Sequence, residues 1–169
     1  MDNLYSTALH LSRDPDHAAD LLQDTFLRAY RAWHQFQPGT NCKAWLLTIL
    51  YNAFRNRYRA ERSVPTTVEF DEALYTGEPE MTSTGSLDPA ELLAAHVLDG
   101  DIQEALQKLP EEYRTAVVLV DLQELTYEEA AAVVGAPVGT IRSRLSRGRH
   151  ILQHHLRHFA QERGLLRRG

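Results

Sequence analysis

The chain has 169 residues, of which 43% are hydrophobic, and its formal net charge is −5 at pH 7. This length is enough for one medium domain or two small helical units, and it does not require a large catalytic core. The chain has a single cysteine, Cys42, and therefore cannot form an internal disulfide. No stretch has the pattern of a signal peptide or of a membrane span, which needs about 18 apolar residues. We therefore expect a cytoplasmic protein without membrane insertion.

Charge is distributed unevenly along the chain. Residues 63–99 contain eight acidic side chains and no lysine or arginine. Residues 1–62 carry eight basic and six acidic side chains, and residues 100–169 carry ten basic and nine acidic side chains. The acidic interval is rich in Pro, Gly, Ser and Thr and has no helical periodicity, which is typical of a poorly packed linker. We therefore expect two domains joined by a flexible acidic tether.

The amino-terminal part predicts helices. Asp14 is a suitable N-cap and Pro15 a suitable first helical residue, and the segment that follows places apolar side chains on one stripe at three-to-four-residue spacing. The stripe predicted to be buried consists of Ala18, Leu22, Phe26, Ala29, Tyr30 and Trp33. Polar side chains off such a stripe normally form a solvated face; here they are Asp20, Gln23, Asp24, Arg28 and Arg31.

A turn with Pro38 and Gly39 separates this helix from a second helix predicted over residues 42–62. The second helix should bury Trp45, Leu46, Ile49, Leu50 and Ala53. Amide and basic side chains gather elsewhere on its surface, namely Asn52, Arg55, Asn56, Arg59 and Arg62. Amide and guanidinium groups bind base edges or phosphates, and aromatic faces stack on unpaired bases, so this part of the chain indicates contact with nucleic acid.

The carboxy-terminal part contains a more specific pattern. Pro110 starts a helix whose first turn holds Glu111 and Glu112, and the frame around its Ala-Val-Val-Leu-Val run favours a buried helix over a short strand. Thr126 and Glu129 form a capping-box pattern at the start of the next helix.

Gly135 should end that helix, and a further helix begins after a short turn. Its predicted core stripe is Ile141, Leu145, Gly148 and Leu152. The side chains predicted to face away from the core are Arg142, Ser143, Ser146, Arg147 and Arg149. This layout is that of a helix-turn-helix, whose second helix enters the major groove of DNA. Charge acts locally, within a Debye length of about 10 Å at moderate salt, so an acidic chain can carry such a basic patch.

Two segments in this order carry a family resemblance. Residues 14–59 and 109–152 resemble sigma domains 2 and 4 of the bacterial extracytoplasmic-function sigma factors, which belong to the sigma-70 family, and Phe-Gln-Pro-Gly-Thr-Asn followed by Lys-Ala-Trp-Leu is most similar to their stress-responsive, redox-linked branch. The resemblance implies an all-α fold with two small helical domains. Domain 2 would span residues 1–63, and domain 4, which contains the helix-turn-helix, would span residues 98–169. A flexible acidic linker over residues 64–97 would join them.

The resemblance also implies three sets of site residues. The helix that would grip the clamp helices of the polymerase beta-prime subunit carries Asp20, Leu21, Gln23, Asp24 and Phe26. The loop that would receive a flipped base of the minus-10 element, and the helix beside it, carry Gln37, Gly39, Thr40, Asn41, Lys43, Trp45, Asn52, Arg55, Asn56 and Arg59. Flipping a base costs a few kcal/mol, which a pocket that binds the extruded base repays. The helix for the minus-35 element carries Thr140, Arg142, Ser143, Arg144, Ser146, Arg147 and Arg149.

The function that the resemblance implies is that of an alternative sigma factor, which binds core RNA polymerase, directs promoter recognition, helps melt the minus-10 region and starts transcription. The implied partners are core RNA polymerase, through its beta-prime clamp helices and its beta subunit, promoter DNA, and an anti-sigma factor that covers both domains. The acidic linker would thread polymerase channels otherwise used by nucleic acid; the alternative is a tether that its charge keeps soluble. Which arginines of the last helix read bases and which hold phosphates stays open at the level of sequence.

Two other classes of function compete with this one. The first is a dimeric helix-turn-helix regulator that binds duplex DNA without polymerase. The second is a helical metal-binding or interaction protein built around His150, His154, His155 and His158, although the absence of a His-Glu-x-x-His frame favours a polar helix face. Cys42 is either a redox-sensitive thiol or a small apolar filler. No catalytic motif occurs in the sequence, so we expect no enzyme, no cofactor and no metal site.

Overall fold

A computed structural model describes residues 2–61 and 99–162, so the predicted tether over residues 64–97 lies outside the described residues. Residues 2–61, here called the amino-terminal bundle, contain α1 (Asp2–Ser12), α2 (Pro15–Arg31), the short 3-10 helix η1 (Trp33–Gln35) and α3 (Cys42–Glu61). Residues 99–162, the carboxy-terminal bundle, contain α5 (Asp99–Gln107), α6 (Glu111–Val117), the π-helical turn η3 (Val118–Leu122), α7 (Tyr127–Val134) and α8 (Val138–Glu162). Within these two ranges no strand is present, and the all-α prediction is confirmed.

Helix α2 starts as its sequence predicts, but it buries a different face. Asp14 accepts hydrogen bonds from the backbone N–H groups of Asp16 and His17, and Pro15 is the first helical residue. The buried positions are Ala18, Leu21, Thr25 and Ala29. The prediction that the aromatic residues of the stripe are buried was wrong, because Tyr30 is 85% exposed and Trp33 59% exposed, with Phe26 also on the surface. The core face is therefore narrower than the apolar arc of the helix, and the aromatic part of that arc faces outward.

Helix α3 is covered on more sides than its amphipathic pattern indicates. Leu50 and Ala53 are buried as predicted, whereas Trp45, Leu46 and Ile49 are only half-buried. Buried side chains that the pattern missed are Leu47, Tyr51 and Phe54. The physical reason is that α3 packs against α2 on one side and α7 on another, so a single stripe cannot account for its burial.

The carboxy-terminal bundle follows its local signals closely. Thr126 and Glu129 form a complete capping box, and Gly135 ends α7 in the left-handed region, with φ at 72°. The Ala-Val-Val-Leu-Val run is helical and buried except for its last residue, the half-buried Val120, and its last three residues lie in the π-helical turn η3. All four predicted core residues of α8 are buried: Ile141, Leu145, Gly148 and Leu152.

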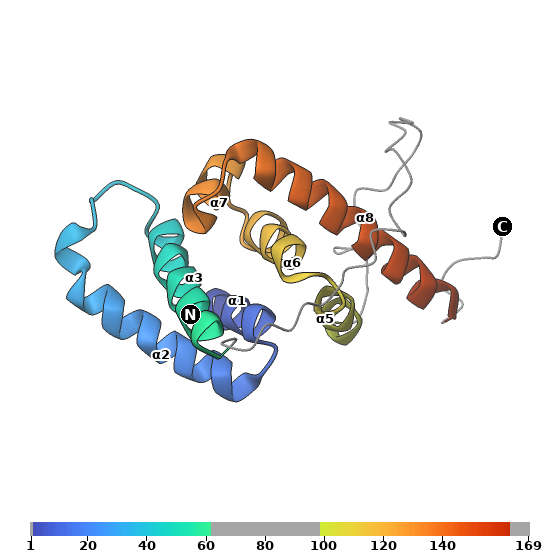
Figure 1. Ribbon diagram of the computed structural model, residues 1–169, viewed down its shortest axis with the longest axis horizontal. Coiled ribbons are helices and arrows are strands. Elements are labelled where there is room, and N and C mark those ends of the chain that lie inside the picture. Colours follow the sequence, from blue (N-terminus) through green and yellow to red (C-terminus); the bar gives the residue numbers. More distant parts are fainter. Residues whose placement is uncertain (1, 62–98, 163–169) are drawn as a thin grey trace.

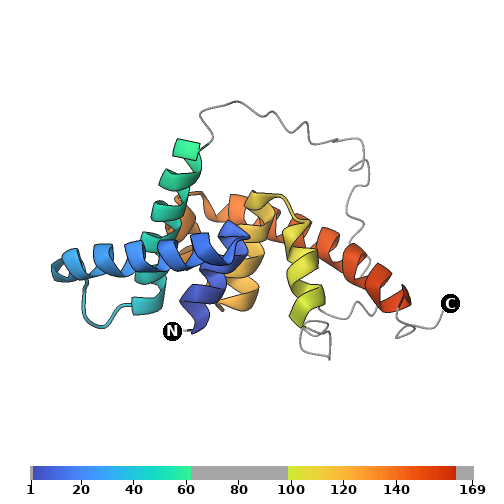
Figure 2. The ribbon, with the colours of Figure 1, turned by 90° about the horizontal axis from the view of Figure 1, so that it is seen from below.

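The two bundles pack against each other through a shared hydrophobic cluster. One cluster of buried side chains lies within the carboxy-terminal bundle, between α5, α6 and α8. The larger cluster draws on both bundles, because it joins α1, α2 and α3 to η3, α7 and the start of α8. In Figure 1 the beginning of α3 lies beside α7, and Figure 2 shows α1 against the carboxy-terminal helices from a second side. The described residues therefore pack as a closed pair of bundles.

Candidate nucleic-acid interface

The exposed side of α8 carries the basic residues predicted for DNA contact. Arg142, Ser143, Ser146 and Arg147 are exposed, and their opposite face is the buried stripe that packs on α6 and α7. The turn between Gly135 and Val138 sets the start of α8 at an angle to α7, as a helix-turn-helix requires. Thr140, in the first turn of α8, is half-buried.

The four arginines of this helix have different surroundings. The Arg142 guanidinium lies over the Tyr127 ring, 5.6 Å from its centroid, and remains exposed. Arg147 is exposed and donates a hydrogen bond of 3.4 Å to the Tyr113 hydroxyl.

Arg144 and Arg149 are held more closely by the bundle. Arg144 Nη2 lies 3.4 Å from Glu112 Oε1, so the two side chains form an ion pair. Arg149 donates from Nε to Asp121 Oδ2 at 3.0 Å and makes a second hydrogen bond to the other carboxylate oxygen. The Asp121 side chain is only 5% exposed, so this bidentate pair fastens α8 to η3. Arg142 and Arg147 are thus more open to a ligand than Arg149.

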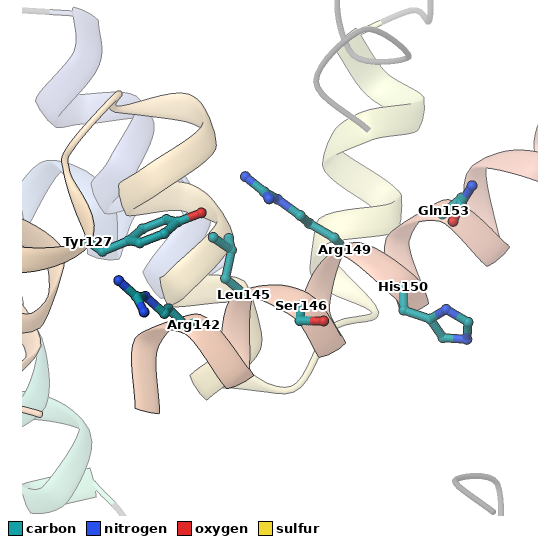
Figure 3. A pocket seen from close by; sticks show the side chains of 7 residues that line it. All are labelled: Tyr127, Arg142, Leu145, Ser146, Arg149, His150 and Gln153. Atoms are coloured by element: carbon teal, nitrogen blue, oxygen red, sulfur yellow. The ribbon is translucent and has the colours of Figure 1, made fainter. Parts of the chain in front are cut away.

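An open groove of about 460 Å³ runs along this side of the helix. Its lining residues are Tyr127, Arg142, Leu145, Ser146, Arg149, His150 and Gln153. Figure 3 shows the Arg142 guanidinium beside the Tyr127 ring and the Arg149 side chain directed away from His150, which points to the other side of α8. The groove combines an aromatic face with two guanidinium groups, a combination that suits phosphate and base contacts.

The second candidate site is the loop between η1 and α3, residues 36–41, together with the first two residues of α3, Cys42 and Lys43; residues 36–43 are here called the η1–α3 loop. The Thr40 hydroxyl donates to the Gln37 carbonyl at 2.7 Å, and Gly39 has φ of 89°, so these residues form a tight turn. Asn41 caps α3 by accepting from the Ala44 N–H at 3.2 Å. The predicted loop residues are therefore brought together by local structure.

An aromatic cluster lies at the base of this loop. Trp33 stacks on Phe36 with ring centroids 5.3 Å apart, and Phe36 lies 5.2 Å from Trp45. Trp33 also meets Trp45 edge-on at 6.0 Å. The sequence analysis did not single out Phe36; its place between two tryptophans in the chain was the available signal. The cluster provides partly exposed ring faces next to the loop.

The remaining predicted residues of α3 lie farther along the helix. Asn52 and Asn56 are exposed, and Arg55 is half-buried over the Tyr51 ring at 5.8 Å. The side chain of Arg59 lies outside the described residues. The structure thus places these amide and basic groups on α3 but several turns from the η1–α3 loop.

The residues predicted to contact polymerase lie on α2. Asp20 and Gln23 are exposed, and Asp24 accepts from Arg28 Nε at 3.0 Å. Leu21, which the resemblance also places in this set, is only 2% exposed and belongs to the core. Sequence reasoning missed two exposed apolar side chains on the same helix, Leu27 at 57% and Tyr30.

The histidine run on α8 is a partly exposed helix face. His154 and His155 have ring centroids 6.1 Å apart, and partial burial, followed by the charges of Lys108 and the neighbouring histidines, lowers the pKa of His155. No group of three or more His, Cys, Asp or Glu side chains in residues 2–61 and 99–162 is arranged to hold a metal ion. Cys42 is a half-buried free thiol. None of the helices in the same ranges is both long and apolar enough to cross a membrane.

Comparison with known families matches both bundles in order. The Sigma-70 region 2 family matches residues 1–64, and the Sigma-70, region 4 family matches residues 99–152. The chain is 40% identical over 147 residues to the ECF RNA polymerase sigma factor EcfG of Rhodopseudomonas palustris, covering 87% of this chain and 75% of that protein. It is 36% identical over 161 residues to the ECF RNA polymerase sigma factor SigE of Mycolicibacterium smegmatis, covering 95% of this chain and 60% of SigE.

Two similar solved structures are complexes of two proteins. The sigma factor RpoE of Bartonella quintana, in complex with the anti-sigma factor NepR, matches with a TM-score of 0.67 and 34% identity over 91% of this chain and 89% of that one. CnrH, in complex with the cytosolic domain of CnrY, matches with a TM-score of 0.58 and 26% identity over 90% of this chain and 79% of that one. With region 2 and region 4 in order and a 40% identical relative covered over three quarters of its length, the chain belongs to the extracytoplasmic-function sigma factors, which direct RNA polymerase in transcription initiation.

Proposed function

We propose that the two bundles divide promoter recognition between them, with the exposed side of α8 binding the minus-35 element and the η1–α3 loop receiving a base of the minus-10 element. The observation that carries this proposal is the order of elements in the carboxy-terminal bundle: a capped α7, a left-handed Gly135, and an α8 whose exposed residues are basic. A recognition helix needs a polar face exposed to solvent and an anchored opposite face; in α8, Arg142, Ser143, Ser146 and Arg147 are exposed, and Ile141, Leu145 and Leu152 are buried.

Within α8, Arg142 and Arg147 are the main contacts to DNA in this proposal, because both are exposed at the outer side of the helix. Arg149 acts mainly by fastening α8 to η3 through Asp121. Thr140, Ser143, Arg144 and Ser146 complete the surface. In the amino-terminal bundle, the contact residues for the minus-10 element are Gln37, Gly39, Thr40, Asn41, Lys43, Trp45, Asn52, Arg55, Asn56 and Arg59.

The proposed surface for core polymerase is the outer side of α2. Asp20, Gln23 and Asp24 supply its polar contacts, and Phe26, Leu27 and Tyr30 supply exposed apolar area. Exposed apolar side chains rimmed by charge are typical of protein interfaces, in which aromatic residues supply much of the binding energy. Asp24→Ala should weaken binding to core polymerase and leave binding of duplex promoter DNA unchanged.

One similar structure holds a sigma factor with an anti-sigma factor, so we extend the proposal to an anti-sigma partner for this chain as well. As a sigma factor it would act in the cytoplasm and without catalysis of its own. The proposed domain limits are residues 1–63 and 98–169, with the acidic linker over residues 64–97.

Run-off transcription tests this function. Core polymerase is incubated with promoter fragments from the same genome, with and without the full chain, and transcripts are mapped. Transcripts that appear only with the chain, and that share two upstream elements, are expected. Binding of the chain to duplex DNA without any transcript would instead favour a regulator that works without polymerase.

A further inference from the structure

Arg142 is held by a different kind of contact from two of its neighbours on α8. Arg144 and Arg149 each form an ion pair with a carboxylate, which takes up N–H donors of the guanidinium. The Arg142 guanidinium instead lies over the Tyr127 ring, 5.6 Å from its centroid (Figure 3). The ring attracts a cation through its quadrupole and offers no lone pair of the carboxylate kind, so the N–H donors of Arg142 stay available to DNA.

The Tyr127 ring is itself anchored. Tyr127 is the first residue of α7, directly after the N-cap Thr126, and the capping box sets where this helix begins. Its half-buried ring packs against the hydrophobic cluster between α5, α6 and α8. The same side chain lines the open groove along α8, together with Arg142. One part of the ring is thus fixed by the core, and another part faces the groove.

A restrained arginine binds DNA at a lower entropic cost. Immobilising a long side chain at an interface costs conformational entropy, and the cost is smaller where the side chain is already held in the bound direction. Tyr127 lies on the first helix of the helix-turn-helix and Arg142 on the second, and α7 and α8 pack directly on each other. The crossing of the two helices therefore brings the ring and the guanidinium together.

We propose that Tyr127 is a positioning residue for DNA recognition: its ring holds the Arg142 guanidinium in the direction from which it enters the major groove at the minus-35 element. This inference rests on the proposed function of α8. Tyr127 acts through Arg142, and the part of the side chain that acts is the ring face and not the hydroxyl. Phenylalanine should therefore replace tyrosine at this position, whereas leucine should not.

A double-mutant cycle in the holoenzyme tests this coupling. Core polymerase is saturated with the full chain carrying Tyr127→Leu, Arg142→Ala or both, and the Kd for a promoter fragment identified by run-off transcription is measured. Leucine keeps apolar volume against the cluster but removes the ring. Binding of each variant to core polymerase and its urea midpoint are measured separately, so that loss of loading or of folding is kept apart from loss of DNA binding. Tyr127→Met, with another apolar shape, repeats the cycle if the leucine variant unfolds.

Tyr127→Leu should raise the Kd for promoter DNA about two- to fivefold, the range for losing one exposed cation–π contact. The same substitution should have almost no effect in the Arg142→Ala background, because no guanidinium is left for the ring to hold. Tyr127→Phe should recover most of the lost affinity. A matched control combines Tyr127→Leu with Arg147→Ala; these effects should add, because the Arg147 guanidinium contacts Tyr113 of α6.

Two results would overturn the positioning role while the sigma function stands. An equal loss of affinity on Tyr127→Leu with and without Arg142 would mean that the ring supports the fold or contacts DNA by itself. A loss in Tyr127→Phe as large as that in Tyr127→Leu would assign the effect to the hydroxyl. A third result, an unchanged Kd in Arg142→Ala, would refute the proposed DNA contact of Arg142 and the inference with it.

Discussion

Helices α2 and α8 both carry an apolar stripe, but the stripe has a different meaning in each. On α8 the stripe is the core, and the exposed side is polar and basic. On α2 the core takes Leu21 and its neighbours, and a second set of apolar side chains, which includes Leu27 and Tyr30, remains exposed. The comparison shows that an apolar face can serve folding in one helix and a partner in another.

The largest expected effect on stability distinguishes a leucine of the α8 core from an exposed leucine of α2. Leu152→Ala, in the α8 core, should lower the free energy of unfolding by about 2–5 kcal/mol, because it removes buried methyl groups and leaves a cavity. Leu27→Ala, on the exposed side of α2, should change stability by less than about 0.5 kcal/mol but weaken binding to core polymerase. Urea unfolding and a polymerase binding assay on both variants check this. A large stability loss in Leu27→Ala would mean that the exposed side of α2 serves the fold.

A second contrast lies between two arginines of α8. Arg149→Ala leaves the buried Asp121 carboxylate without its bidentate partner and should cost about 3 kcal/mol of stability. Arg147→Ala should leave stability within about 0.5 kcal/mol of wild type but reduce promoter binding and make its salt dependence shallower. Thermal unfolding and binding titrations at several salt concentrations distinguish the two roles. Equal destabilisation by both substitutions would mean that Arg147 stabilises the fold as much as Arg149 does, which contradicts the assignment of Arg149 to the fold and Arg147 to DNA.

The features of the carboxy-terminal bundle that sequence predicted are local ones. The capping box and the end of α7 depend only on residues close to one another in the sequence. The spacing of Thr126, Glu129 and Gly135 was therefore sufficient to predict both features. Periodicity also identified Ile141 and Leu152, because α8 has a single buried stripe.

Features that depend on distant parts of the chain were not predictable. Tyr51 and Phe54 are buried in the cluster that joins α3 to the carboxy-terminal bundle, and no pattern within α3 indicates that contact. Likewise, Asp121 and Arg149 are 28 positions apart, and Asn41 and Glu129 are 88 apart, so their pairing requires the folded arrangement. Sequence thus supplied candidate site residues, which stay predictions, whereas the side chains that pair with them became visible only in the tertiary structure.

The close approach of α6 and α8 gives a smaller expected effect. A Cβ atom added at Gly148 would lie 2.9 Å from Val117 Cγ2 and 3.1 Å from the Tyr113 carbonyl oxygen, and Val117 is fully buried. Gly148→Ala should therefore cost about 1–2 kcal/mol, the overpacking penalty less the gain in helix propensity. Gly139→Ala, on the same helix, meets nothing within 4 Å and should be neutral or stabilising. Chemical denaturation of both variants tests whether α8 needs glycine only where it meets α6.

The smallest effect concerns pH and the contact between the bundles. His10 of α1 has a buried Nδ1 with no hydrogen-bond partner among the described residues, and burial, followed by the charge of Arg114 on α6, lowers the pKa of His10 below its ordinary value of 6.5. The unfolded chain therefore binds more protons than the folded chain just below pH 6.5, so the unfolding free energy should fall as the pH drops from 7.5 to 5.5.

His10→Gln should reduce this dependence, whereas the exposed His17→Gln should retain it. Urea midpoints of the three proteins at pH 7.5 and 5.5 provide the measurement. Because Arg114 belongs to the other bundle, protonation of His10 places a second positive charge at the contact between α1 and α6. An equal fall of the urea midpoint in all three proteins would show that His10 does not carry the pH dependence.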